Sequence, residues 1–177
     1  MESILIIGGA RSGKSRYALE LAKAYPGGEK TFIATCVPRD DEMKERVERH
    51  RKERGAGWKT LEIPVHIPDA ITQNSRGAGL ILIDCLTLWI ANLIFESKDE
   101  PSINEHLDRL IESIRKADSP VILVSNEVGC GIVPENPLAR RFRDIAGRVN
   151  QQVASVCSTV FWMVAGIPVP VRRPDIP

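Results

Sequence analysis

The sequence lacks an excess of charge of either sign. Its 24 lysines and arginines are offset by 23 aspartates and glutamates, which gives a formal net charge of +1. A chain with so little net charge has no overall field that would draw it to nucleic acid or to an anionic membrane. We therefore expect no nucleic-acid partner, and any anionic ligand must be held by local groups.

The sequence also lacks a Cys-x-x-Cys pair, which argues against a zinc site or a redox motif. The four cysteines, Cys36, Cys85, Cys130 and Cys157, are widely spaced. Two disulfides would be possible in a secreted protein, but three of the four cysteines lie in or beside predicted core strands. Reduced, buried thiols in a cytosolic protein are the better interpretation.

Long apolar runs are absent as well. Residues 1–9 carry no basic segment, and their apolar run is too short for a signal peptide or a membrane span. The later apolar stretches are interrupted by Asp84, Asn92 and Glu96. We expect a cytoplasmic protein with no membrane span.

What the chain does contain is a regular alternation of short apolar runs and amphipathic stretches. The runs are nearly continuous, as in strands that are buried on both faces of a parallel sheet, and they cover 4–8, 31–36, 79–86, 120–128 and 160–166. Helical patterns cover 13–24, 40–54, 88–96, 103–116 and 137–157. The proline-rich end, 168–177, is interpreted as an edge strand or a tail. At 177 residues we expect one α/β three-layer domain, 1–177, with a mainly parallel sheet.

The first apolar run leads into a phosphate-binding loop. Its residues fit G-x-x-x-x-G-K-[ST] at every fixed position and are Gly8, Gly9, Ala10, Arg11, Ser12, Gly13, Lys14 and Ser15. The motif follows a strand and opens a helix, as its mechanism requires, because main-chain N–H groups and the helix N-terminus then face the phosphates. We expect Lys14 to reach the β- and γ-phosphates. The context predicts a P-loop NTPase domain of the RecA-like type.

Asp84 ends a strongly apolar strand, which is the Walker B pattern. An aspartate leaving a buried strand needs a partner, and Mg²⁺ held jointly with the Ser15 hydroxyl is the expected one. The alternative is an aspartate that caps the following helix.

A histidine lies on a basic helix. Met43, Val47 and His50 share one face of the predicted helix 40–54, and Arg46 and Arg54 flank them. Nearby arginines disfavour the imidazolium, so His50 would be a neutral nucleophile. From the residues alone, a partly buried histidine without a catalytic role is the favoured interpretation, and the nucleophile is the alternative.

Several segments together resemble the bifunctional adenosylcobinamide kinase / adenosylcobinamide-phosphate guanylyltransferase family of cobalamin biosynthesis. The resemblance extends over nearly the whole chain, from about residue 3 to 167, and its most specific part is the block Asn126–Gln151. The other matching segments are 8–17, 33–35, 40–43 with Arg46 and His50, 58–62, 84–87 and 92–93.

This resemblance implies the activity and the roles of particular residues. ATP and GTP are the implied substrates, with Mg²⁺ as cofactor. His50 would carry GMP as a covalent intermediate, and Glu127 is a candidate base or substrate ligand, the alternative being an acid that bonds to the adjoining turn. A homo-oligomer, with a trimer possible, is also implied. Beyond the P-loop, the implied nucleotide contacts are Ala34, Thr35, Cys36, Arg51, Lys52, Glu53, Arg54, Glu62 and Asp84.

Two other functions compete with this one. A plain P-loop kinase of another small alcohol would transfer the γ-phosphate without a covalent intermediate. A nucleotide-gated binding module would phosphorylate no acceptor. The guanine-specificity motifs N-K-x-D and T-K-x-D are absent, which argues against a regulatory G protein and leaves guanine nucleotides open as ligands.

Overall fold

The computed structural model describes residues 1–25, 27–38, 40–96 and 99–174, with the side chains of Arg46, His50 and Glu53 left out. Within these residues, seven strands form one sheet in the order β3-β2-β4-β5-β1-β6-β7. The strands are β1 Ser3–Gly8, β2 Glu29–Ala34, β3 Trp58–Glu62, β4 Ala78–Asp84, β5 Val121–Asn126, β6 Thr159–Val164 and β7 Ile167–Arg172. The helices are α1 Lys14–Ala22, α2 Asp41–Arg54, α3 Ile67–Asn74, α4 Leu86–Phe95, α5 Glu100–Lys116 and α6 Pro137–Val156.

The sheet is parallel except at one edge. Strands β1 to β6 run in the same direction, and β7 pairs antiparallel with β6. Pro168 and Pro170 lie opposite Met163 and Phe161 in this edge strand. Proline cannot donate to a ladder, so two prolines at alternate positions are tolerated where a strand has only one partner. The edge-strand interpretation of the proline-rich end is therefore confirmed for Ile167–Arg172, and residues 175–177 lie outside the described residues.

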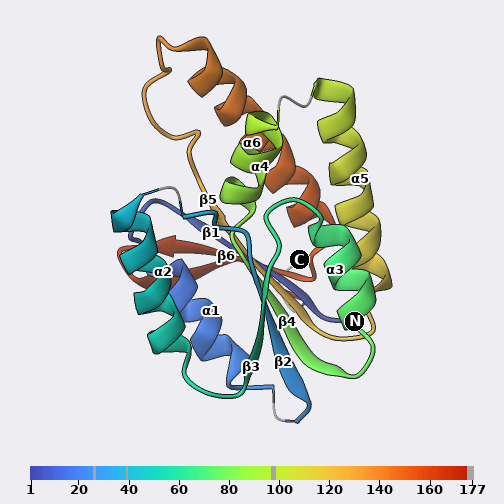
Figure 1. The fold of residues 1–177 in the computed structure, drawn as a ribbon. Coiled ribbons are helices and arrows are strands. Elements are labelled where there is room, and N and C mark those ends of the chain that lie inside the picture. Colours follow the sequence, from blue (N-terminus) through green and yellow to red (C-terminus); the bar gives the residue numbers. More distant parts are fainter. Residues whose placement is uncertain (26, 39, 97–98, 175–177) are drawn as a thin grey trace.

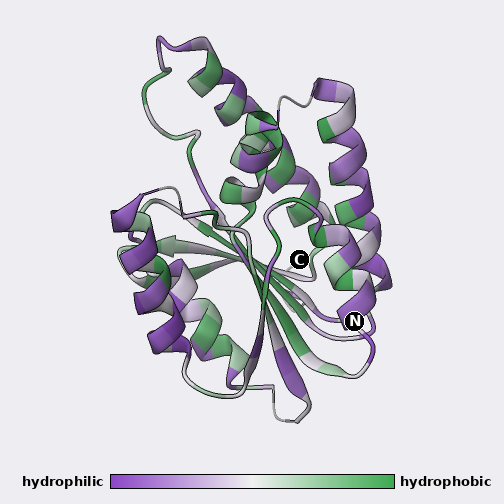
Figure 2. Ribbon diagram, in the orientation of Figure 1, coloured by the Kyte–Doolittle hydropathy of each residue, from purple (hydrophilic) through white to green (hydrophobic). Residues whose placement is uncertain are grey.

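Helices cover both faces of the sheet (Figure 1). Helix α1 packs its alanines Ala18 and Ala22 on one face, against Ile6, Leu82 and their neighbours. Helices α3, α4, α5 and α6 bury a larger apolar cluster on the other face, with Trp89 of α4 fully enclosed. The central strands are correspondingly the most hydrophobic part of the ribbon (Figure 2). These layers confirm the predicted three-layer α/β architecture.

Helix α2 differs from the other helices. It lies on the same side of the sheet as α1, at the left of Figure 1, and is almost entirely hydrophilic in Figure 2. None of its described side chains is buried; Met43 and Val47 are half-buried and most of the others are exposed. Asp40 caps its N-terminus by accepting a hydrogen bond from the Met43 N–H at 2.7 Å. Local capping and charge order, rather than core packing, therefore define this helix.

The predicted strands and helices are confirmed to within a few residues, and two elements were missed. Strand β3 is short, lies at the sheet edge and has no fully buried side chain, so it lacks the apolar run that marked the others. Helix α3 begins with Ile67-Pro68 after Pro64, a composition that indicates a loop. Proline at a first helical position is nevertheless favourable, because its missing N–H would have no partner there.

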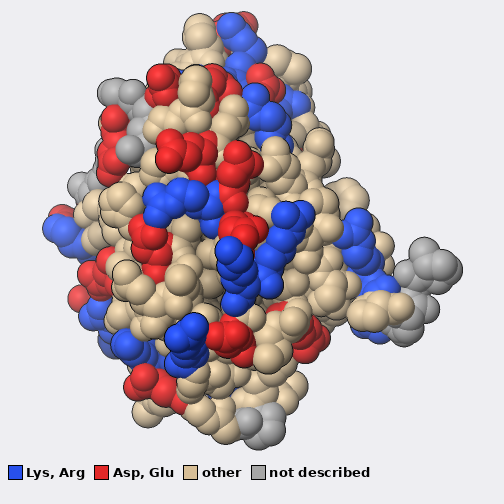
Figure 3. All heavy atoms as spheres, turned by 90° about the vertical axis from the view of Figure 1, so that its right-hand side faces the viewer, with Lys and Arg blue, Asp and Glu red and all other residues tan. Residues whose placement is uncertain are grey.

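The surface on the side of α3 and α5 carries interspersed charges of both signs, with no large area of one sign among the described residues (Figure 3). Of the helices in the described part of the chain, none combines the length and apolar character needed to cross a bilayer. All four cysteines are free thiols, and Cys85 and Cys157 are buried.

Candidate nucleotide site

At the P-loop, three main-chain segments come close together: the loop itself, strand β6 and the turn that follows β6. Gly8 ends β1, and a Cβ atom there would lie 2.7 Å from the Met163 carbonyl oxygen of the adjacent strand β6. Gly13 has φ +92°, a conformation that glycine adopts without strain, and it is the N-cap of α1. The N–H of Gly166, in the turn between β6 and β7, donates to the Ser12 carbonyl at 3.1 Å. The C-terminal hairpin therefore holds the loop.

Lys14 lies against this loop rather than in solvent. Its side chain is buried, and Nζ donates to the Gly9 carbonyl at 2.6 Å, with Ser12 Oγ at 3.4 Å. Burial raises the pKa of the Cys85 thiol, and the positive charge of Lys14 acts on this pKa in the opposite direction. An ammonium bonded to a neutral carbonyl and a hydroxyl of the loop can exchange these acceptors for charged phosphate oxygens, which bind it more strongly.

Asp84 ends β4 at the same edge of the sheet as the P-loop, with β5 between β4 and β1. The N-cap of α4 is Cys85, whose side chain makes no capping bond, so the alternative of Asp84 as a helix cap is wrong. Burial, followed by the negative charge of Asp84, raises the pKa of the Cys85 thiol to about 11. Cys85 is thus a neutral thiol beside a half-buried carboxylate.

Thr35 fixes the turn that follows Asp84. Its fully buried hydroxyl donates to the Cys85 carbonyl and accepts from the Cys85 N–H, both at 2.8 Å. The Thr35 N–H donates to the Asp84 carbonyl at 3.2 Å, and the Thr35 carbonyl accepts from Asn92 Nδ2 at 2.8 Å. With its hydroxyl and main chain engaged in this way, Thr35 ties the end of β2 to the end of β4.

The segment from α2 to β3 brings together two of the implied nucleotide contacts. Arg51 pairs with Glu62 at 2.8 Å. The guanidinium of Arg54 lies 3.8 Å from the centre of the Phe32 ring and donates to Thr60 Oγ1 at 3.1 Å. Burial lowers the pKa of Arg54, the charge of Arg51 lowers it further, and the charge of Asp84 acts in the opposite direction. Arg54 therefore sits within electrostatic reach of the Asp84 carboxylate.

The side chain of His50 lies outside the described residues, as do those of Arg46 and Glu53. The main chain of His50 is in α2, between the half-buried Val47 and Arg51. The roles predicted for His50 and Glu53 therefore remain predictions. Lys52 is exposed on the same helix, and Cys36 is half-buried just beyond β2.

Glu127 follows β5 at the same edge. Its N–H donates to the Gly8 carbonyl at 3.0 Å, and its carboxylate Oε1 accepts from the Gly129 N–H at 2.5 Å. The alternative interpretation, an acid bonded to the adjoining turn, is thus confirmed for one oxygen. The loop that follows is braced by α6, because Arg143 donates to the Ile132 and Gly129 carbonyls and Arg140 donates to the Pro134 and Glu135 carbonyls.

A buried polar network at the end of β5 was not recognised from the sequence. Asn126 Nδ2 donates to Thr87 Oγ1 at 2.9 Å, and Asn150 Nδ2 donates to the Asn126 carbonyl at 3.1 Å. All three residues lie in segments that carry the family resemblance, but no local pattern indicated that they contact one another. Three elements, β5, α4 and α6, meet in this network.

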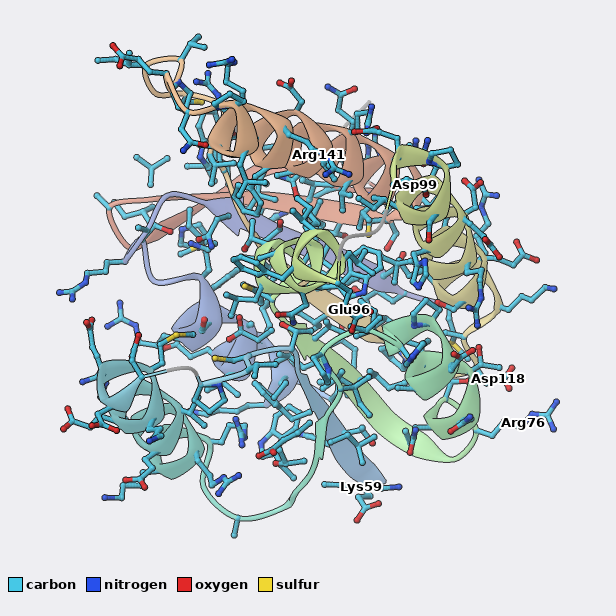
Figure 4. All side chains as sticks on the ribbon, turned by 45° about the horizontal axis from the view of Figure 1, so that its top comes forward. Lys59, Arg76, Glu96, Asp99, Asp118 and Arg141 are labelled. Atoms are coloured by element: carbon cyan, nitrogen blue, oxygen red, sulfur yellow. The ribbon has the colours of Figure 1, made fainter. Side chains whose placement is uncertain are left out.

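Apart from Arg54, which contacts Phe32 and Thr60 in the middle of β2 and β3, these groups lie at the edge of the sheet where the parallel strands end. The opposite edge carries surface ion pairs and hydrogen bonds, such as Arg76 with Asp118 at 3.5 Å and Lys59 with Asn74 at 3.0 Å. Figure 4 shows Lys59, Arg76 and Asp118 on that opposite side. Among the described residues, no group of three or more His, Cys, Asp or Glu side chains is placed to hold a metal ion. Ligand binding at the carboxyl ends of strands is the general rule for open α/β sheets.

Comparison with known proteins identifies the family. The family model for cobinamide kinase / cobinamide phosphate guanyltransferase matches residues 4–171. The chain belongs to this family. Among members of the cobinamide kinase / guanyltransferase family, the bifunctional adenosylcobalamin biosynthesis protein CobU of Escherichia coli K12 is 41% identical, over 96% of this chain and 99% of that protein. The bifunctional adenosylcobalamin biosynthesis protein CobP of Pseudomonas aeruginosa PAO1 is also 41% identical, over 95% of this chain and 96% of CobP.

Solved structures relate the cobinamide kinase / guanyltransferase chain to a wider class of proteins by fold alone. The RadB recombinase superposes with a TM-score of 0.56 at 16% identity. The superposition covers 99% of this chain and 83% of the RadB chain. The flagellar accessory protein FlaH of Methanocaldococcus jannaschii superposes with a TM-score of 0.54 at 12% identity, covering 97% and 78%. The predicted P-loop, RecA-like fold is thereby confirmed.

Proposed function

We propose that the protein catalyses both reactions named by its family, phosphorylation of adenosylcobinamide and transfer of GMP to the product, at one nucleotide site. The observation that carries the proposal is that Lys14 on the P-loop, Asp84 at the end of β4 and Arg51, paired with Glu62 at the end of β3, belong to one edge of the sheet. Phosphoryl and nucleotidyl transfer depend mainly on positioning and on stabilising negative charge, which these groups supply.

Mg²⁺ fits the groups at this edge. Ser15 lies in the first turn of α1, and the half-buried Asp84 ends β4, so their hydroxyl and carboxylate offer the hard oxygen ligands that Mg²⁺ prefers. When bound between them and the nucleotide, the ion would neutralise charge on the phosphates. The nucleotide itself would supply further oxygen ligands, since Mg²⁺ is commonly held by one or two protein groups plus phosphates.

In the first reaction, the aminopropanol hydroxyl of adenosylcobinamide attacks the γ-phosphorus of ATP or GTP. A new O–P bond forms, the bond to the β-phosphate oxygen breaks, and the hydroxyl proton passes to a base, for which Glu127 is the candidate at the end of β5. The main-chain N–H groups of Gly8–Ser15 and the Lys14 ammonium hold the phosphates and offset the charge that moves onto the leaving diphosphate.

In the second reaction, an imidazole nitrogen of His50 attacks the α-phosphorus of GTP, and pyrophosphate leaves. A phosphate oxygen of adenosylcobinamide phosphate then attacks the same phosphorus, the P–N bond breaks, and adenosylcobinamide-GDP results. A covalent intermediate divides one difficult transfer into two easier ones. Ala34, Thr35, Cys36, Arg51, Lys52, Glu53, Arg54 and Glu62 are the proposed further nucleotide contacts, and the Arg51–Glu62 pair, both partly exposed, would need to reorganise to serve GTP.

GTP labelled at the α-phosphate, supplied without corrinoid, tests the histidine. The protein should acquire label that is stable in alkali and lost in acid, as a phosphoramidate is. His50→Ala should remove the label, whereas His66→Ala, at the exposed N-cap of α3, should keep it. Labelling of His50→Ala at the wild-type level would contradict the proposal. For the kinase step, Lys14→Ala should abolish transfer from γ-labelled ATP to adenosylcobinamide.

We also propose a homo-oligomer, with a trimer possible. Trp162 and Val164 of β6 lie opposite Val169 and Ile167 of β7, and all four are exposed apolar side chains on one face of the ribbon. Adjacent apolar side chains of this size are typical of a contact surface. Trp162→Glu with Val169→Lys should shift the mass measured by light scattering towards the monomer. An unchanged mass would show that subunits meet elsewhere.

A further inference from the structure

The place of β5 in the sheet gives one asparagine a special position. Strand β5 lies between β1, which leads into the P-loop, and β4, which ends at Asp84. In the strand register Asn126 pairs with Gly8, the first residue of the P-loop, and Val124 pairs with Asp84. Asn126 therefore lies at the edge of the sheet between the phosphate loop and the Walker B carboxylate.

The side chain of Asn126 is held in a defined orientation. Its Nδ2 donates to Thr87 Oγ1 at 2.9 Å, and Thr87 is buried in the first turn of α4. Its main-chain carbonyl accepts from Nδ2 of the buried Asn150 at 3.1 Å. Thr87 and Asn150 are thus two buried polar side chains that bond to one asparagine at the end of a strand, and the Thr87 hydroxyl also lies 3.1 Å from Cys85 Sγ.

This arrangement carries a cost that apolar residues would avoid. Asn150 Oδ1 is buried without a hydrogen-bond partner among the described residues, and an unsatisfied buried polar atom is destabilising. Buried polar networks that are only partly satisfied are worse for stability than an apolar core. The network is therefore better explained by the position that it gives Asn126 than by stability.

We propose that Asn126 binds the γ-phosphoryl group in the kinase step, an inference that rests on the proposed function. The Nδ2 amino group has two hydrogens; Thr87 takes one, and the second donates to a γ-phosphoryl oxygen. Lys14 lies on the P-loop with its Nζ bonded to the Gly9 carbonyl, and a lysine in this position of the motif reaches the β- and γ-phosphates. The terminal phosphate then lies between the P-loop and Asp84, which is where Asn126 stands.

The two reactions use this contact differently. Transfer to the alcohol moves the γ-phosphoryl group itself, so a donor aimed at its oxygens stabilises the transition state. Guanylyl transfer breaks the bond between the α- and β-phosphates and leaves the γ-phosphoryl group intact within pyrophosphate. Asn126 is thus a catalytic residue of the first reaction and only a binding contact in the second, and Thr87 is its positioning residue.

Four variants test this inference: Asn126→Ala, Asn126→Asp, Thr87→Val and Thr87→Ser. Phosphorylation of adenosylcobinamide by Asn126→Ala should fall about 10²-fold in kcat, the usual effect of removing one preorganised donor. Labelling from α-labelled GTP should fall less than about tenfold, since one ground-state contact of this kind is worth about 1.4 kcal/mol or less. Thr87→Val should lose kinase activity in the same direction, and Thr87→Ser, which keeps the hydroxyl, should restore it.

Nucleotide affinity gives a second measurement that does not depend on turnover. Wild-type protein should bind GTP more tightly than GDP, and Asn126→Ala should lose most of that preference, because only GTP carries the γ-phosphate. A merely structural role would weaken both nucleotides equally. Asn74→Ala, at the end of α3 on the opposite edge, is the matched control and should leave the ratio unchanged.

The outcomes separate this inference from the proposed function. Wild-type protein that transfers no γ-phosphate to adenosylcobinamide would contradict the proposed function, and the GTP to GDP ratio would still decide the role of Asn126. Kinase activity of Asn126→Ala within twofold of wild type, or equal weakening of GTP and GDP, would overturn the role of Asn126 alone. If Asn126→Ala unfolds, the nearly isosteric Asn126→Asp serves instead; its added negative charge should repel the γ-phosphate and reverse the preference.

Discussion

The hydroxyl of Thr35 makes two hydrogen bonds to the main chain of Cys85, 50 residues later in the sequence, donating to its carbonyl and accepting from its N–H. These two hydrogen bonds join the end of β2 to the residue that follows Asp84 at the end of β4. It gives Thr35 a structural role that is separate from any main-chain contact with a nucleotide.

Thr35→Val should leave both main-chain groups of Cys85 without this partner. Each buried group left unpaired costs about 1–3 kcal/mol, so we expect a loss of free energy of unfolding in that range or above, measured by urea denaturation. Thr35→Ser should retain most of the stability. Thr72→Val, which removes the hydroxyl of an exposed residue bonded to the Pro68 carbonyl on α3, is the control and should cost about 1 kcal/mol or less.

Cys157 should make stability sensitive to alkali. Burial raises the pKa of its thiol from 9.0 to about 12. Between these values the unfolded chain loses the thiol proton and the folded chain keeps it, so the free energy of unfolding falls as pH rises from about 9 towards 12. The loss from this residue approaches about 1.4 kcal/mol per pH unit. Comparing Cys157→Ala with wild type by urea unfolding at about pH 7.5 and about pH 10.5, on either side of the ordinary thiol pKa, measures it.

The control for that experiment is Cys130→Ala, because Cys130 is exposed. The fall in stability between the two pH values should be smaller in Cys157→Ala than in wild type and unchanged in Cys130→Ala. Equal falls in all three proteins would show that other groups account for the alkaline loss.

Gly79 should not tolerate a side chain. A Cβ atom there would lie 2.0 Å from the Gly27 carbonyl oxygen, which belongs to main chain and has little room to move. Gly79→Ala should therefore destabilise the protein by about 1–3 kcal/mol or more, as overpacking does, with a lower midpoint in thermal unfolding. Gly147→Ala, in α6 where a Cβ meets nothing within 4 Å, should be neutral or stabilising, because alanine favours helix.

Arg143 should control the order of the loop that follows Glu127. Its guanidinium donates to two loop carbonyls, those of Gly129 and Ile132. Arg143→Ala should increase hydrogen exchange in residues 129–135, since exposed loops without such bonds open at low free-energy cost. Arg148 lies on the same helix as Arg143 and forms a surface ion pair with Glu100 of α5. Arg148→Ala removes this pair and should leave hydrogen exchange in the loop unchanged.

The sequence predicted the elements whose pattern is local. Buried parallel strands such as β1 and β4 appear as apolar runs, and the P-loop marks the first strand–helix junction. Strand β3 escaped because an edge strand needs no continuous apolar run. Two alternatives that the sequence left open needed coordinates: Asp84 is not the cap of α4, and one oxygen of Glu127 bonds to the adjoining turn.

The remaining features depend on contacts between distant positions. Thr35 with Cys85 and Asn126 with Thr87 are side-chain pairs whose partners no local pattern specifies. Strand order also depends on contacts between distant positions, because hydrophobic periodicity does not predict that β5 lies between β1 and β4. The family resemblance implied that Thr35 contacts the nucleotide. Its hydrogen bonds in the structure show that it also holds the main chain of Cys85.

The first strand depends on the last third of the chain. Strand β1 pairs with β5 and β6, and the turn at Gly166 holds the Ser12 carbonyl of the P-loop. During synthesis, the glycine loop therefore emerges long before the strands and the turn that shape it. A nascent chain ending before residue 159 would carry the complete motif yet lack two of these supports, so nucleotide binding should appear late in translation, close to the completion of the sheet.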